Sequence, residues 1–456
     1  MTASAPVLLE EATTCRVVSP ALYTIAENAF AKHAIVATVQ LRPTPYKWSL
    51  AKHCRPEAQA LVSTTGGRTY HRAATVQPLC PADDAPLSAC ATNITAGLMR
   101  LPSESGLLLV APPRLSPASL PTHASQIMSA TLWTLGADGQ LVPAQQQQSL
   151  SFGGFPPLTT RERCLQGTSA AAGPLLTPAT MSAVTLPDGG AVSAFLGVVA
   201  DGAEDIACHC CRSVLFFRQE QRRNSTWRFI SRLRPAVDAT NVSAWGDGFG
   251  HGTLVRLPSG TVMGLFSVGK CSTMLAQSTT RNGVTWSRLT FPPQLWGTSP
   301  QLLALSNGVL ALTAGGPGLA LWLSRSEGEV WTQHNLACLY NSMQWNISLR
   351  FDGEMRRAVS PTTGAGSNPP QDYAPCGANF GGGVPETSGY TALAEVEPGV
   401  LLVAFDRRCD NTTHGYWWCG SVNAAFGMRL RLEPVAGADE TVGLPEMYGH
   451  QPCSTY

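Results

Sequence analysis

The chain has 456 residues, 13% of them charged, and a formal net charge of +1. So small a net charge gives no reason to expect nucleic acid or an acidic membrane surface as a partner. Gly and Pro are plentiful, at 43 and 34 residues, and charged residues fall far below the roughly one quarter of an average soluble domain. This balance disfavours long solvent-exposed helices and favours many short strands joined by turns.

Cysteines and glycosylation acceptors favour an extracellular or secretory setting. There are 14 cysteines, many of them in polar, loop-like contexts, which is typical of an oxidising compartment. Chance acceptors combined with reduced thiols are the alternative. Met1–Arg16 has neither a basic start nor a sustained apolar core, so it does not resemble a signal peptide. No run approaches the ~18 apolar residues of a membrane-spanning helix. The Asn-x-Ser/Thr acceptors are Asn93, Asn224, Asn241, Asn346 and Asn411.

In chain order, one pattern recurs: an apolar strand, a turn that usually contains Gly, and a second apolar strand. Strand-like runs on both sides of a turn signal predict a β-hairpin. The first copy is weaker than the others, with Glu27-Asn28 as its expected turn. The copies are Ala21–Val39, Leu98–Ala111, Ala183–Leu196, Thr253–Phe266, Gln301–Thr313 and Thr391–Phe405.

A second pattern, a turn with Gly followed by an aromatic residue, comes after several of these hairpins. In Thr279–Trp286, the pair Asn282-Gly283 tolerates positive φ, and Thr285-Trp286 is expected to begin a return strand. Arg222–Trp227 is a degenerate version without the Gly. The three clearer copies are Ser63–Tyr70, Thr279–Trp286 and Ser324–Trp331.

Together, the two patterns define six four-stranded units. Such units repeated around an axis form a β-propeller, so we predict an all-β, six-bladed propeller of antiparallel blades, with residues 1–456 as one domain. Two β-sandwiches are the alternative, but sandwiches would not require the same turn to recur. The segment 346–389 is expected to be a loop insert. The blades are expected near residues 20–85, 90–150, 175–235, 248–292, 298–345 and 388–434.

The alternating patterns resemble the sialidase (neuraminidase) superfamily, whose blades carry the Asp box, Ser-x-Asp-x-Gly-x-Thr-Trp, on the outer hairpin. In that family the Asp side chain binds the turn backbone and the Trp packs between hairpins. Here the Asp is replaced by Thr65, Arg281 and Ser326. Thr and Ser can still accept a backbone N–H bond, whereas Arg cannot. The resemblance covers most of the chain and implies a sialidase-like propeller. It is less specific for function, because Asp boxes also occur in lectins and other non-hydrolytic propellers.

The resemblance also implies candidate catalytic residues. Family enzymes clamp a carboxylate with three arginines, attack with a Tyr assisted by a Glu, and protonate the leaving group with an Asp; a Tyr nucleophile is a known exception among glycosidases. Tyr390, which precedes the inner strand of the last blade, matches the nucleophile segment. Asp406 matches an acidic residue that supports an arginine, and His251 stands at the Glu position. The alternative for Tyr390 is an aromatic residue that lines the axial channel.

Positions at which the family has arginines hold other residues here. A charged hydrogen bond to a carboxylate contributes roughly 1.5–3 kcal/mol, so sialic acid is not the expected ligand unless a loop supplies an arginine. The candidates for that role are Arg212, Arg234, Arg357 and Arg407. The replaced positions are Ala179-Thr180-Met181, Ser267 and Gly315-Gly316-Pro317.

Two further acidic residues, Asp247 and Glu386, are candidates near the axial mouth. Asp247 and His251 share a Gly-rich stretch, and a surface turn with a capping Asp is the alternative. Cys208–Cys211 lacks the ligand spacing of a zinc site, and we expect no metal or cofactor. A disulfide between Cys409 and Cys419 would display an aromatic pair, Trp417-Trp418, unless both rings pack into the last blade.

Two functions remain open from the sequence. One is a divergent exo-glycosidase with Tyr390 as nucleophile, acting on a glycan or glycoconjugate. The other is a catalytically inactive propeller that binds glycans or extracellular proteins.

Overall fold

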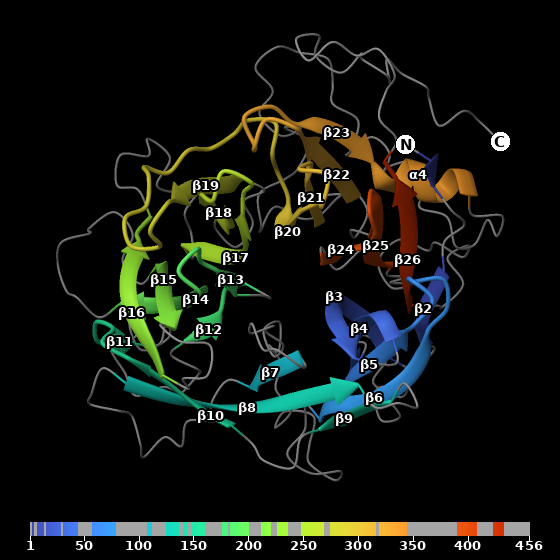
Figure 1. Ribbon diagram of the computed structural model, residues 1–456, viewed down its shortest axis with the longest axis horizontal. Helices are drawn as coiled ribbons and strands as arrows, with labels where there is room; N and C mark the ends of the chain where they lie inside the picture. The colour runs from blue at the N-terminus through green and yellow to red at the C-terminus, as the bar shows by residue number, and fades with distance from the viewer. Residues whose placement is uncertain are drawn as a thin grey trace.

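A computed structural model describes most strands of the chain, and they form a ring of antiparallel sheets around one axis (Figure 1). This arrangement confirms the predicted all-β, six-bladed propeller. Among the described residues, no helix is both long enough and apolar enough to cross a membrane. The described residues are 2–3, 7–12, 15–28, 31–43, 57–78, 107–111, 125–135, 140–143, 148–159, 176–180, 183–199, 211–219, 226–235, 248–268, 274–315, 319–343, 390–407 and 423–432.

The first blade is a four-stranded antiparallel sheet. Its order is β3 (Cys15–Asn28), β4 (Ala31–Pro43), β5 (Glu57–Ser63) and β6 (His71–Pro78). The predicted first hairpin is confirmed, but β3 continues through Glu27 and Asn28, and Asn28 pairs with Ala31. The residues expected to form the turn therefore belong to the strand.

The second and third blades share one sheet, which the sequence did not predict. The second contains β7 (Leu107–Ala111), β8 (Ser125–Leu135), β9 (Leu141–Pro143) and β10 (Gln148–Gly153). The parallel pairing of β10 with β16 joins the two blades through their outer strands. Pairing across blades covers strand edges that would otherwise be open. The third blade contains β11 (Leu158–Thr159), β12 (Thr177–Pro178), β13 (Val184–Thr185), β14 (Ala191–Val199), β15 (Arg212–Gln219) and β16 (Thr226–Leu233).

The fourth blade has three regular strands among the described residues: β17 (Phe249–Arg256), β18 (Val262–Val268) and β19 (Leu275–Thr280). No regular strand begins at Thr285-Trp286, so the prediction of a return strand there is wrong. Two isolated bridges form instead, Met274 with Trp296 and Gln277 with Thr290, and the second pair exchanges backbone hydrogen bonds of 2.8 and 2.9 Å. Pro292 and Pro293 lie between the two bridges and have no N–H to donate, so the pairing is interrupted there.

The fifth blade follows the predicted pattern. It consists of β20 (Thr298–Ala304), β21 (Leu310–Gly315), β22 (Leu319–Ser324) and β23 (Thr332–Asn335), with the short helix α4 (Leu336–Met343) after it. The fully buried ring of Tyr340 on α4 contacts Phe405 of the next blade at a centroid distance of 5.3 Å. The helix therefore caps the junction between the fifth and sixth blades.

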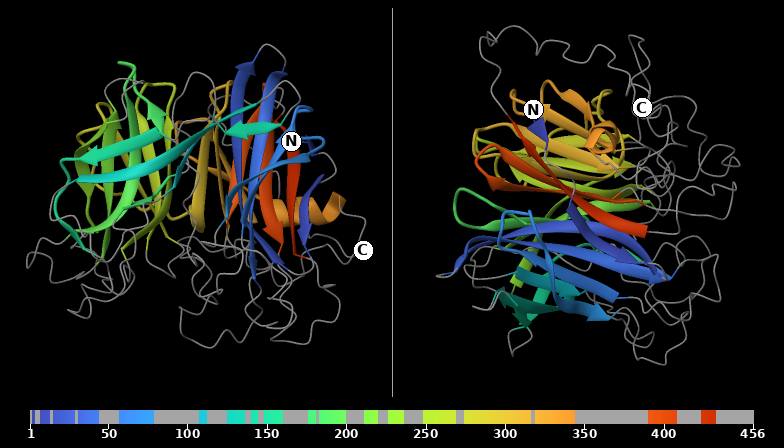
Figure 2. Two further views of the ribbon diagram at one scale, coloured as in Figure 1. Left: turned by 90° about the horizontal axis from the view of Figure 1, so that it is seen from below. Right: turned by 90° about the vertical axis from the view of Figure 1, so that its right-hand side faces the viewer.

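The sixth blade is completed by the N-terminal end of the chain. Its inner strands are β24 (Thr391–Glu397), β25 (Val400–Arg407) and β26 (Asn423–Arg431). Outside β26 lie β2 (Val7–Ala12) and β1 (Thr2–Ala3), both antiparallel to it (Figure 2). The expected blade at 388–434 lacked this outer strand. Because the two ends of the chain share one sheet, the ring is closed by backbone hydrogen bonds.

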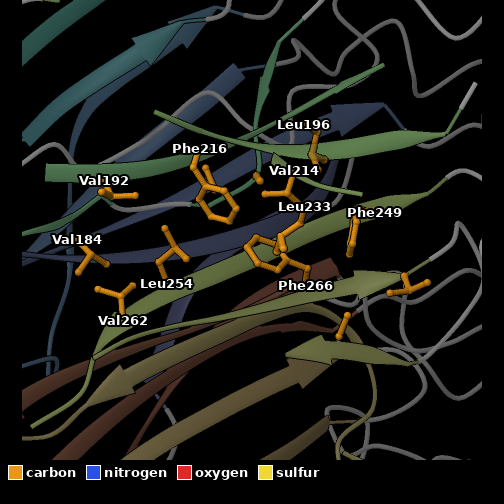
Figure 3. Packing of buried hydrophobic residues seen from close by; sticks show 14 of the residues in the cluster. Val184, Val192, Leu196, Val214, Phe216, Leu233, Phe249, Leu254, Val262 and Phe266 are labelled. Carbon is orange, nitrogen blue, oxygen red and sulfur yellow. The ribbon is translucent and has the colours of Figure 1, made fainter. Parts of the chain in front are cut away.

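The core lies between blades. The cluster at the junction of the third and fourth blades contains Val184, Phe216, Phe249, Leu254 and Phe266, whose side chains face one another from both sheets (Figure 3). Burial of such side chains contributes ~1.5–3 kcal/mol each. Blade-to-blade contact therefore stabilises the ring.

The turns of the first, fourth and fifth blades each pack against the preceding blade of the ring. Trp286 of the fourth-blade turn stacks on Phe216 of the third blade, with ring centroids 4.0 Å apart. Gly328 of the fifth-blade turn lies against Met263 of the fourth, and Gly67 of the first-blade turn lies against Leu402 of the sixth. A side chain at either glycine would collide with these neighbours, and both glycines have positive φ. Both the positive φ and the lack of space for a side chain therefore favour glycine at these two positions.

Short side chains cap these turns. The Ser63 hydroxyl accepts a bond from the Gly67 N–H (2.9 Å), and the Ser324 hydroxyl accepts one from the Gly328 N–H (3.0 Å). Two residues on, Thr65 and Ser326 accept bonds from the Thr69 N–H (3.0 Å) and the Val330 N–H (2.8 Å). This confirms that Thr65 and Ser326 accept backbone N–H bonds in these turns.

The fourth-blade copy is shifted by one residue from its predicted register. The Thr280 hydroxyl accepts the bond from the Gly283 N–H (3.0 Å), and Asn282 Oδ1 accepts from the N–H groups of Val284 (2.8 Å) and Thr285 (2.9 Å). Asn282 therefore caps this turn, whereas the side chain of Arg281 is exposed. This turn is one residue shorter than the other two. An alignment that starts from the first residue of each turn therefore matches Arg281, and not Asn282, to Thr65 and Ser326.

Candidate functional site

Tyr390 and His251 meet where the innermost strands of their blades begin, which we call the mouth of the ring. Tyr390 directly precedes β24 of the sixth blade and His251 lies near the start of β17 of the fourth blade. Tyr390 Oη lies 3.5 Å from His251 Nε2, and the rings meet edge to face with centroids 5.6 Å apart. This distance is at the long end of the range for a hydrogen bond. The two residues come from blades separated by a whole blade, so their contact marks a point of convergence.

The register of the inner hairpins gives a third residue the corresponding position on the fifth blade. Gly260 and Gly308 end identical turns, in which each glycine N–H donates to the carbonyl three residues earlier. His251 precedes Gly260 by nine residues, Ser299 precedes Gly308 by nine, and Tyr390 precedes the hairpin glycine Gly399 by nine. These positions correspond on three consecutive blades. We name His251, Ser299 and Tyr390 the mouth triad.

The second strands place three more residues beside this triad. Ser267, Gly315 and Asp406 each follow their hairpin glycine by seven residues. The Ser267 hydroxyl donates to the His251 carbonyl at 3.0 Å. Asp406 is fully buried and pairs with Ala425 in the sheet. None of these three positions carries a cation.

A run of glycines lets the backbone at His251 approach its neighbours closely. A side chain at Gly248 would lie 2.4 Å from the backbone of Arg212, one at Gly250 would meet the Ser267 hydroxyl, and one at Gly252 would meet the Phe266 ring. Gly248 also has φ +84. Larger residues at these positions would push the chain outward, so the glycines set the position of His251.

The surroundings of His251 keep its imidazole neutral. Burial lowers its pKa to about 4, and the nearby positive charge of Arg212 lowers it further. By accessible surface the residue is only half-buried. Arg212 reaches this point because its backbone bridges to Gly248. Its neighbour Cys211 is disulfide-bonded.

The structure brings together some of the predicted site residues and does not describe others. Tyr390 and His251 are in contact, and Asp406 lies at the corresponding end of β25. Asp247 and Glu386 lie outside the described residues, as do Trp417 and Trp418. Within the described ranges, no group of three or more His, Cys, Asp or Glu side chains is placed to hold a metal ion.

Sequence reasoning missed Ser299. It lies between two recognisable features, the glycine of a hairpin and a preceding Gly-rich turn, and counting back from Gly308 would have found it. His251 and Tyr390 drew attention because their side chains are chemically distinctive, whereas a serine before a proline is not.

Comparisons with known proteins give likenesses in structure only. No protein-family model and no curated protein matches the chain. Several similar solved structures are sialidases. A Hadza microbial sialidase has 11% identity and a TM-score of 0.49, with 91% of this chain and 65% of that chain covered.

Two further likenesses are of the same kind. A Trypanosoma rangeli sialidase in complex with sialic acid has 11% identity and a TM-score of 0.49, with 93% and 57% covered. An intramolecular trans-sialidase from Ruminococcus gnavus has 10% identity and a TM-score of 0.44, with 94% and 98% covered. This chain therefore spans less than two thirds of the length of the first two. At such identities nothing about activity follows.

Proposed function

We propose that this protein is a glycan-directed propeller of the extracellular or secretory space, and that it cleaves a terminal sugar with Tyr390 as nucleophile. The observation that carries this proposal is the contact between Tyr390 Oη and a neutral His251 Nε2 at the ring mouth. A phenol is a weak nucleophile at its ordinary pKa of ~10 and needs a neighbouring base to activate it.

The proposed first step forms a glycosyl-tyrosine. In the tautomer with its proton on Nδ1, His251 accepts the Tyr390 proton at Nε2 while the phenol oxygen bonds to the anomeric carbon. The bond to the leaving oxygen breaks, and a carboxylic acid protonates that oxygen so that an alcohol departs. Asp247 and Glu386 are the candidates for this acid.

The second step restores the protein. The carboxylate formed in the first step removes a proton from water, and the water oxygen attacks the anomeric carbon. The bond to Tyr390 breaks, and the imidazolium of His251 returns its proton to the phenol oxygen. Two displacements at one carbon would retain its configuration.

A second candidate function is glycan binding without turnover, or binding of an extracellular protein. One observation favours it: an imidazole whose pKa is lowered to about 4 is a weak base. Such a group accepts a hydrogen bond readily but takes up a full proton poorly at neutral pH. Ser267 and Gly315, where the family resemblance expects arginines, also provide no carboxylate clamp.

Hydrolysis of fluorogenic methylumbelliferyl glycosides separates the two functions. The panel contains a sialoside and the galactoside, glucoside, mannoside and fucoside. We expect turnover of at least one glycoside, reduced more than about 100-fold by Tyr390→Phe, the range seen when an acid–base or nucleophilic group is lost. Tyr70→Phe, a change at a tyrosine in the first-blade turn, is the matched control. Glycan binding with no turnover on any sugar would contradict the enzyme and support the second candidate.

A further inference from the structure

Ser299 has a backbone conformation that serine rarely adopts. Its φ is +51°, and it is one of two non-glycine residues with positive φ among those described, whereas eleven glycines there have positive φ. The left-handed region costs an L-residue energy because Cβ approaches the carbonyl oxygen. The next residue is Pro300, and a residue before proline favours extended backbone instead. Glycine at position 299 would remove much of this strain.

The surrounding structure holds Ser299 in this conformation. The Thr298 hydroxyl donates to the Gly315 carbonyl at 3.1 Å, and the Leu302 N–H donates to the Thr253 hydroxyl of the fourth blade at 3.0 Å. The ladder between β20 and β21 shifts register between Thr298 and Gln301. Ser299 thus sits in a β-bulge pinned on both sides, and bulges often redirect a residue beside an active site.

The other residue with positive φ shows what can justify such strain. Glu327, at φ +49°, lies in the turn of the fifth blade, and its carboxylate accepts the Ser259 N–H of the fourth blade at 2.8 Å. Its side chain joins two blades. At Glu327, the strained backbone therefore accompanies an identifiable contact between two blades.

Ser299 lies in the mouth triad, 4% exposed, on the blade between those of His251 and Tyr390. We propose that Ser299 is a ligand-binding residue whose strained backbone directs its hydroxyl to a hydroxyl group of a bound sugar. This inference rests on the proposed function, since it assigns a further contact in the same site. A serine hydroxyl both donates and accepts, which suits a neutral sugar hydroxyl. It binds no anomeric carbon and takes no part in the covalent steps.

Two substitutions separate the hydroxyl from the strain. Ser299→Ala removes the hydroxyl and keeps the strain, whereas Ser299→Gly removes both. We expect each variant to bind sugar about three- to tenfold more weakly, the loss for one hydrogen bond. We also expect Ser299→Gly to melt at a higher temperature than Ser299→Ala. Glu327→Gly, the same change at the other strained residue, is the control and should leave the Kd unchanged.

The measurement uses the full chain, calorimetric titration with the methyl glycosides of galactose, glucose, mannose and N-acetylneuraminic acid, and thermal unfolding. Unchanged affinity in both Ser299 variants would overturn the inference while leaving the proposed function intact. Equal melting temperatures of Ser299→Ala and Ser299→Gly would overturn the claim of strain. Failure of the unmodified protein to bind any of these glycosides would contradict both proposals.

Discussion

The two ends of the blades have diverged in different ways. At the turn end, Thr65, Ser326 and Asn282 differ in identity yet all accept backbone N–H bonds. At the mouth end, His251 and Tyr390 occupy corresponding positions but offer different chemistry. A turn needs only a short acceptor, which several residue types supply. A binding site depends on the particular group, so substitution there changes what the protein does and leaves the fold in place.

The largest expected effect is at the turn end. Trp286→Ala removes the stack on Phe216 and opens a cavity between the third and fourth blades. We expect a loss of ~3–5 kcal/mol in the free energy of unfolding, measured by chemical denaturation. Phe291→Ala, at a ring that is 38% exposed, is the control and should cost far less. Equal losses for the two variants would contradict the claim that Trp286 joins the third and fourth blades.

A smaller effect distinguishes Asn282 from Arg281. Asn282→Ala leaves the N–H groups of Val284 and Thr285 without their acceptor, and we expect it to cost ~1–2 kcal/mol, as for the loss of a cap. Arg281→Ala should change stability by less than ~0.5 kcal/mol because the side chain is exposed. The readout is the loss of unfolding free energy in each variant, compared between the two. A larger loss for Arg281→Ala than for Asn282→Ala would support the register predicted from the sequence, in which residue 281 takes the capping position.

The smallest effect is at the mouth end and depends on pH. His251 has a folded pKa of about 4, below its unfolded value, so the unfolded chain binds more protons between about pH 6.5 and pH 4. Stability is therefore lost as pH falls through this window, by less than ~1 kcal/mol in total because His251 is only half-buried and solvent screens its charge. His251→Gln should flatten this part of the profile. Parallel profiles for the two proteins would show that His251 is not held neutral by folding.

The sequence predicted the repeated hairpins well because each is local. The hairpins around Gly260, Gly308 and Gly399 formed where a turn glycine separated two apolar runs. The pairing of β2 with β26 and of β10 with β16 was not predictable in the same way, because each joins segments far apart in the chain. Tyr390 and His251 could be proposed from the resemblance, but their contact depends on how three blades converge.

The most direct test of the central claim is to trap the intermediate on Tyr390. The full chain would be incubated with a ring-fluorinated sugar that carries a fluoride leaving group, using the sugar that the methylumbelliferyl panel favours. Fluorine on the ring slows the second displacement, so a glycosyl-enzyme accumulates. We predict one added sugar by intact-mass measurement, on the peptide that contains Tyr390, and none with Tyr390→Phe. An unmodified Tyr390 peptide, or an equal adduct in Tyr390→Phe, would contradict the account.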